Sequence, residues 1–285
     1  MLFDSHTHSY FSPDADKGAE IEAMAIKAQE LGLSYITVTD HCDCCYWLPE
    51  SEGEYDEYQK ADSIMFGSRD YSKASIEKTL LLKQKHENLL CGTELGEPLQ
   101  NIKAAEEILS IDGLDFVIGS LHMNSGKPDF YYLEYDNVDI SVIRVLLGRY
   151  FTEVLDMCKW GGFDSLGHLT YPLRYIQGEY EITIDMRRYN DIIREIFCTL
   201  IEKGKALELN TSGFRQKYGK PFPEEKYLRL YRELGGELVT IGSDAHNIFD
   251  IGAGIRRGEE LLKACGFKYI TVYKGRKPEN FKLDI

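Results

Sequence analysis

The sequence predicts an α/β fold in which parallel strands alternate with helices. Three observations point to this class: short apolar runs recur along the 285 residues, longer segments of helical periodicity separate them, and 43% of the residues are hydrophobic. A chain of this length can bury a large core, and we find no repeat, low-complexity tract or Pro/Ser-rich linker. We therefore expect a single domain over residues 1–285.

The first predicted unit is a strand, a helix and a second strand. The helix spans Glu20–Leu31, where apolar side chains recur at helical spacing, and Gly32 follows as the left-handed residue that often ends a helix. Apolar runs predict strands at Leu2–Asp4, Tyr35–Val38, Leu89–Cys91, Asp115–Ile118, Phe163–Leu166, Ala206–Leu209, Leu238–Ile241 and Tyr269–Val272. Helical periodicity predicts further helices at Tyr71–His86, Asn101–Leu109, Val142–Trp160, Met186–Lys203, Glu224–Leu234 and Gly258–Cys265.

Two long segments interrupt this alternation, Asp43–Asp70 and Asn124–Asp139. The first is acidic and aromatic, and the second contains a run of tyrosines. Both would lie at the same end of the sheet, where the loops of α/β barrels commonly determine specificity. We expect acidic or aromatic groups from these segments to contact the substrate, although the aromatic residues of Asp129–Tyr135 could also form the apolar underside of a lid.

Composition excludes several classes of function. There are 33 Lys+Arg against 47 Asp+Glu, a net charge of −14, which disfavours general nucleic-acid binding. No apolar stretch approaches the ~18 residues of a membrane helix, and the N-terminus lacks the pattern of a secretion signal. The 7 cysteines suit a reducing compartment, so we expect a cytoplasmic protein. Cys42, Cys44 and Cys45 are interpreted as reduced thiols beside a functional loop.

The strongest functional signal is the placement of the histidines. All except His86, which we assign to solvent or packing, stand at or just beyond the C-terminal end of a predicted strand. In a barrel of parallel strands these ends meet at one mouth, so residues distant in sequence become neighbours. One such histidine would ordinarily be a packed core side chain, but a group of them with two carboxylates favours a metal site. The group is His6, His8, His41, Glu94, His122, His168, Asp244 and His246.

Residue spacing and ligand type refine this hypothesis. His6 and His8 are two residues apart, so both side chains can point to one side of a strand, about 6–7 Å apart. Asp244 and His246 repeat the spacing. Imidazoles and carboxylates without a cysteine suit zinc, iron or manganese, and such mixed sets often leave positions open for water and substrate.

The order of these motifs along the chain resembles that of a known family. The sequence contains His6-Thr7-His8, Thr39-Asp40-His41, Gly92-Thr93-Glu94, Ser120-Leu121-His122, Gly167-His168 and Gly242-Ser243-Asp244-Ala245-His246. This set, between Leu2 and about Gly254, resembles the polymerase and histidinol phosphatase (PHP) family, and within it the stand-alone histidinol-phosphate phosphatases. The resemblance implies a distorted (β/α)7 TIM-like barrel that holds three divalent metal ions.

The resemblance also implies which residues hold each ion. One ion would be held by His6, His8, Glu94 and Asp244, and Glu94 would bridge to a second ion held by His122 and His168. The third would be held by His41, His246 and Asp14, which stands where many relatives have a histidine. An aspartate there favours a harder metal and predicts a weaker or differently selective third site, unless Asp14 is only a turn residue after Pro13.

A cluster of this kind suits hydrolysis of a phosphate ester by a metal-activated hydroxide, without a covalent phospho-enzyme. Asp244 or His246 could move a proton to the leaving alcohol. Arg174 and Arg215 follow the fifth and sixth predicted barrel strands, and the resemblance implies that they clamp the substrate phosphate. For either arginine the alternative is a solvated surface side chain.

The expected reaction is hydrolysis of L-histidinol phosphate to L-histidinol and inorganic phosphate, in histidine biosynthesis. A PHP-type nuclease or nucleotide phosphoesterase, or a protein-tyrosine phosphatase, would use the same metal site, although the acidic charge speaks against the nuclease. Outside the enzymes, the alternative is a non-catalytic metal-binding protein. The expected partner is a small phosphate monoester, with no nucleic acid and no membrane, and a homo-oligomer is left open.

Overall fold

Parallel strands of the computed structural model, which describes residues 1–46 and 69–283, form a nearly closed barrel. The neighbours pair in the order β1 (Leu2–Thr7), β2 (Leu33–Val38), β4 (Leu89–Gly96), β5 (Phe116–Ser120), β6 (Ser165–Leu166), β7 (Ala206–Asn210) and β8 (Val239–Gly242). β8 returns to β1, because Asp244 N donates to His6 O over 2.8 Å and Thr7 forms a parallel bridge with Ala245. The predicted α/β barrel is confirmed.

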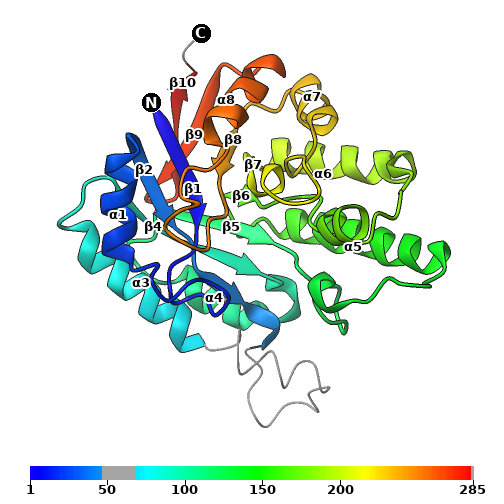
Figure 1. Cartoon of the computed structure of the whole chain (residues 1–285), viewed down its shortest axis with the longest axis horizontal. Helices are drawn as coiled ribbons and strands as arrows, with labels where there is room; N and C mark the ends of the chain where they lie inside the picture. Colours follow the sequence, from blue (N-terminus) through cyan, green and yellow to red (C-terminus); the bar gives the residue numbers. More distant parts are fainter. Residues whose placement is uncertain (47–68, 284–285) are drawn as a thin grey trace.

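Helices surround the strands (Figure 1). They are α1 (Ile21–Glu30), α3 (Arg69–Lys83), α4 (Ile102–Leu109), α5 (Ile140–Trp160), α6 (Asn190–Glu202), α7 (Glu225–Glu233) and α8 (Ile255–Ala264). These lie where periodicity predicts helices, with ends shifted by a few residues. Gly32 follows α1 with φ of 73°, as predicted. Within the described part of the chain, no helix has the length and apolar character needed to cross a membrane.

Apolar packing joins the helices to the outside of the barrel. The largest buried cluster contains Val117 and Leu207 from the strands together with Phe151 of α5 and Phe197 of α6. A second cluster packs α1 against β2 through Met24 and related side chains. Burial of these surfaces outside the barrel fixes the strands, which in turn fix the polar side chains at the strand ends.

The last predicted strand does not join the parallel sheet. β9 (Tyr269–Lys274) instead pairs antiparallel with β10 (Lys277–Lys282). At the hairpin turn, Arg276 forms an ion pair with Asp164, and Gly275 N donates to Asp115 Oδ1 over 3.0 Å. Asp115 and Asp164 directly precede β5 and β6, so this hairpin packs at the N-terminal end of the barrel.

Two short features lie at the opposite, C-terminal end. β3 (His41–Asp43) follows β2 and pairs with the second half of β4. The predicted insertion Asn124–Asp139 is a loop with one helical turn at Phe130–Tyr132. Of the other predicted insertion, Asp43–Asp70, residues 47–68 lie outside the described residues.

Candidate metal centre

The predicted ligand residues come together at the C-terminal end of the barrel. His6 and His8 stand at the end of β1, Asp14 in the loop that follows it, His41 in β3 and Glu94 in β4, while the others lie just after β5, β6 and β8. Among the described residues, four donor groups have ligand atoms within 4.8 Å of one another. They are His6, His8 and Asp244; Glu94, His122 and His168; His8, His41 and His246; and His41, Asp43 and His122.

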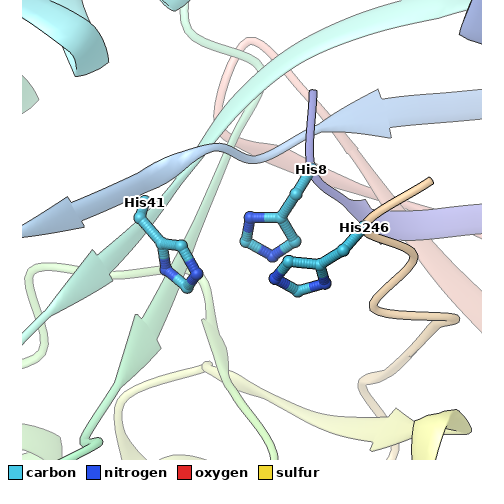
Figure 2. Close-up of side chains that lie close together, drawn as sticks. All are labelled: His8, His41 and His246. Atoms are coloured by element: carbon cyan, nitrogen blue, oxygen red, sulfur yellow. The ribbon is translucent and has the colours of Figure 1, made fainter. Parts of the chain in front are cut away.

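One of these groups gathers side chains from three distant parts of the chain (Figure 2). The rings of His8 and His246 stack with centroids 4.1 Å apart, and the ring of His41 is 4.3 Å from that of His8. Asp14 Oδ2 lies 3.1 Å from His246 Nε2 and 3.5 Å from His41 Nε2. The structure therefore places Asp14 beside the two histidines with which the family resemblance groups it.

Glu94 occupies the centre of the whole cluster. Its Oε1 lies 2.8 Å from His168 Nε2 and 3.2 Å from His122 Nε2. Its Oε2 lies 3.4 Å from His6 Nε2, and 3.5 and 3.0 Å from nitrogens of His8 and His41. A single buried carboxylate thus touches donors from all the groups, which is the arrangement that a bridging ligand needs.

The hydrogen bonds around His6 and His8 test whether this set fits a metal ion. His6 Nδ1 lies 2.7 Å from Glu208 Oε1, and because a carboxylate only accepts, His6 carries its proton on Nδ1. Ser12 Oγ donates to Asp40 over 2.7 Å, so it accepts from His8 Nδ1, 3.0 Å away. When both rings are neutral, each presents an unprotonated Nε2, and these two nitrogens lie 3.0 Å apart.

Two facing lone pairs at that distance repel each other, and either a proton on one nitrogen or a metal ion bound by both relieves the repulsion. Asp244 Oδ1 lies 3.7 Å from His6 Nε2 and 3.5 Å from His8 Nε2. Neutral imidazoles with a carboxylate, each held from behind by a second hydrogen bond, are typical of protein metal sites. The residues therefore fit a divalent metal ion.

Burial and charge shift the pKa values of the cluster in opposite directions. Burial alone would lower the pKa of His6, but the negative charges of Glu208, Glu94 and Asp244 raise it well above the usual value. The pKa values of His41 and His122 rise for the same kind of reason. Burial would raise the pKa of Glu94, yet the surrounding imidazoles hold it well below its usual range.

The cluster opens into a cavity of about 420 Å³. Tyrosines and acidic side chains form much of its wall beyond the donor groups. Tyr171 donates to Asp129 Oδ1 over 2.9 Å, and its ring lies 5.1 Å from that of His122. The cavity is lined by Asp14, His41, Asp43, Glu94, His122, Met123, Asp129, Tyr131, Tyr132, His168, Tyr171, Arg174, Tyr175, Asp244 and His246.

The structure places the two predicted arginines differently. Arg174 lines the cavity and donates to Asp244 Oδ2 and Ser212 Oγ, each over 3.0 Å. Arg215 donates instead to the backbone oxygens of Ser243 and Asp244, over 2.7 and 2.8 Å. It is not among the described residues that line the cavity. Phosphate binding by Arg215 therefore stays a prediction, without the direct access to the cavity that Arg174 has.

Sequence reasoning missed the carboxylates that lie behind the ligands. Glu208 contacts His6 directly, Asp40 holds the Ser12 hydroxyl that contacts His8, and Glu97 accepts from His122 N over 2.5 Å. Burial raises the pKa of Glu97 to about 8. The available signal was an acidic residue inside an otherwise apolar run, as in Leu207-Glu208-Leu209. The described Cys42, Cys44 and Cys45 are buried free thiols.

Comparisons with known proteins agree with this geometry. The model of the PHP domain family matches residues 4–212. A probable histidinol-phosphatase of Thermotoga maritima is 30% identical over 284 residues, which cover 99% of this chain and 100% of that protein. The histidinol-phosphatase of Lactococcus lactis is 26% identical over 99% of this chain and 98% of that protein.

A solved structure gives the same result. The crystal structure of the Lactococcus lactis histidinol phosphate phosphatase, complexed with zinc, L-histidinol and phosphate, has a TM-score of 0.71 and 25% sequence identity, and 98% of each chain is covered. The family model covers most of the chain, and the relatives extend over nearly all of it. The chain therefore belongs to the PHP domain family.

Proposed function

We propose that this protein is a metal-dependent histidinol-phosphatase, which hydrolyses L-histidinol phosphate to L-histidinol and inorganic phosphate in histidine biosynthesis. The main support for the proposal is the position of Glu94, whose carboxylate lies close to residues of every donor group at the mouth of the barrel. Full-length relatives named histidinol-phosphatase support the substrate.

The metal ligands follow from the donor groups. We assign one ion to His6, His8, Glu94 and Asp244, a second to Glu94, His122 and His168, and a third to Asp14, His41 and His246. Zinc in the Lactococcus lactis structure supports a divalent ion, and the number of three ions is part of the proposal. When bound, such ions supply the Lewis-acid chemistry that activates water and neutralises phosphate oxygens.

Arg174 is assigned to the substrate phosphate. Its side chain is 16% exposed at the cavity, and the buried Nε has no hydrogen-bond acceptor among the described residues. The guanidinium carbon lies 5.1 Å from the ring of Tyr171 and 5.3 Å from that of Phe222, which restricts its orientation. The guanidinium is therefore held in a fixed orientation at the cavity wall, and its forked donors match phosphate geometry.

Asp244 is assigned to proton transfer, with His246 as the alternative. Oδ1 of Asp244 faces His6 and His8, whereas Oδ2 faces Arg174 and lies 3.3 Å from Asn210 Nδ2. The two oxygens can thus serve different roles, so that Oδ2 accepts a proton from water and returns it to the leaving alcohol oxygen.

Recognition of the rest of the substrate is assigned to the acidic and tyrosine-lined wall. Asp129 is fixed by hydrogen bonds from Tyr171 Oη and Tyr131 N, and Asp43 also lines the cavity. A carboxylate suits the ammonium group of L-histidinol phosphate, and tyrosine rings suit a flat imidazole. Asp43, Asp129 and Tyr131 belong to the two segments in which the sequence predicted substrate contacts, whereas Tyr171 follows β6.

The test is phosphate release by the zinc-reconstituted protein, with L-histidinol phosphate compared with AMP, phosphotyrosine and a phosphodiester at matched concentrations. We expect a kcat/KM for L-histidinol phosphate that exceeds the others by at least two orders of magnitude, since among these compounds only L-histidinol phosphate carries an ammonium group without a carboxylate that the acidic wall would repel. A preference for the diester or AMP would contradict the proposed substrate. If the protein hydrolysed none of these compounds, the assignment as an enzyme would be contradicted.

A further inference from the structure

A buried carboxylate on β7 connects two of the donor groups. Glu208 is 1% exposed. Its Oε1 lies 2.7 Å from His6 Nδ1, and its Oε2 accepts from His168 N over 2.7 Å. Asn210 Nδ2 lies 3.4 Å from the same Oε2. One side chain therefore holds the ring of a ligand at the end of β1 and the backbone of a ligand after β6.

The neighbouring strand is shaped to permit this contact. β8 lies between β7 and β1, and a Cβ on its Gly242 would come within 2.3 Å of His6 Cβ and 2.8 Å of Glu208 Oε1. Contacts that short do not occur between real side chains, so only glycine fits at this position. The absence of a side chain on Gly242 gives Glu208 its path across β8 to His6.

We propose that Glu208 is a positioning residue of the metal centre: it keeps the proton of His6 on Nδ1, so that Nε2 faces the other donors, and it fixes the backbone of His168. This inference rests on the metal centre proposed above. The role needs a carboxylate, because His6 Nδ1–H and His168 N–H are two donors that require two acceptor oxygens.

The substitution Glu208→Gln separates this role from simple space filling. Glutamine has nearly the same shape, but its side chain has one oxygen and one NH2 group, so it can accept from only one of the two donors. The other donor then faces an NH2 group. Loss of a partner behind a metal ligand typically weakens metal affinity by about 10–100-fold, and we expect a loss of that size for zinc.

Zinc affinity is measured by competition with a chromophoric chelator, in Glu208→Gln, the wild type and Asp164→Asn. Asp164 is a matched control, because it is also buried and accepts from Val117 N over 2.9 Å, but it lies at the opposite end of the barrel. We expect Asp164→Asn to bind zinc as the wild type does. If Glu208→Gln binds zinc as tightly as the wild type, the proposed role of Glu208 is wrong. If the wild type also hydrolyses L-histidinol phosphate in the same experiment, the proposed function is unaffected by that result.

A second measurement needs no variant. In the zinc-loaded wild type, ¹⁵N-resolved NMR of the imidazole groups reports which ring nitrogen carries the proton. The proposal expects His6 with a protonated Nδ1 that is hydrogen-bonded, and partial rescue of zinc affinity in Glu208→Asp, which retains two acceptor oxygens. A His6 ring protonated on Nε2 in the wild type would overturn the proposal even if Glu208→Gln failed to fold.

Discussion

Replacing Arg174 by lysine tests whether the cavity holds phosphate through a planar guanidinium. Arg174 donates from one nitrogen to Asp244 and Ser212, while its buried Nε has no acceptor among the described residues. Lysine keeps the positive charge beside Asp244, but it lacks the forked donors and the stacking on Tyr171. The substitution therefore removes the planar arrangement of hydrogen-bond donors but retains the positive charge.

The expected magnitude follows from one lost hydrogen bond to a charged oxygen. Such a bond contributes about 1.5–3 kcal/mol, which corresponds to a loss in kcat/KM of roughly 10- to 160-fold. The loss should be similar for every phosphate monoester that the enzyme hydrolyses, because all of them share the phosphate. Zinc content should stay at the wild-type level, since the charge near Asp244 is retained.

Arg215→Lys is the matched comparison. Arg215 holds the backbone oxygens of Ser243 and Asp244, and Asp244 has φ of 54°, a conformation that residues other than glycine rarely adopt. We expect Arg215→Lys to lower the melting temperature with a smaller loss in kcat/KM than Arg174→Lys. The assays are phosphate-release kinetics, elemental analysis of zinc and thermal melting. A kcat/KM for Arg174→Lys within threefold of the wild type would refute the assignment, as would a larger loss from Arg215→Lys at full zinc content.

Two further substitutions test the centre of the site and its acidic wall. Glu94→Gln should lower zinc content and turnover together, because an amide cannot use both of its polar atoms as metal ligands. Zinc content and phosphate release are measured on the same preparation, and a wild-type level of either would contradict the role of Glu94 as a bridging ligand. Asp129→Asn should raise KM for L-histidinol phosphate at least tenfold and leave KM for p-nitrophenyl phosphate unchanged. Burial raises the pKa of Asp129 to about 6, so KM of the wild type for L-histidinol phosphate should increase as the pH falls through 6. In Asp129→Asn only the substrate still titrates, so the increase in KM over the same pH range should be smaller.

The barrel could be predicted from the sequence because each strand carries its own signal, a short apolar run before a helical segment. β10 carries no such signal. Its residues Lys277–Lys282 are mostly polar, and they form a strand only because the turn at Gly275 and Arg276 brings them against β9. β9 was therefore predicted as a strand, but its antiparallel pairing was not, since pairing depends on a partner that periodicity does not reveal.

The clustering of the candidate ligand residues could be predicted because they follow strands in a fixed order, whereas their supporting residues could not. Glu208 is a lone acid within a strand, and nothing in its spacing connects it to His6, which is 202 positions away. Likewise, Arg174 and Arg215 follow neighbouring barrel strands in equivalent ways. Only the structure shows that one guanidinium lines the cavity and the other binds backbone oxygens.

Removal of the metal should reverse the pH dependence of stability. In the chelated protein, the pKa values of His6, His41, His122 and His246 lie above their unfolded values despite burial, because carboxylates surround them, and these four outnumber His8 and His168, whose pKa values burial lowers. Protonation of these four histidines therefore stabilises the chelated fold below about pH 6.5, and that stability is lost as the pH rises through the raised pKa values. In the zinc-loaded protein the same imidazoles must be unprotonated to bind, so zinc-linked stability is instead lost as the pH falls. Melting temperatures between pH 6 and 9, with zinc and with a chelator, should consequently change in opposite directions. Parallel curves would show that these histidines do not exchange protons for metal, and the assignment of the cluster as a metal centre would fail.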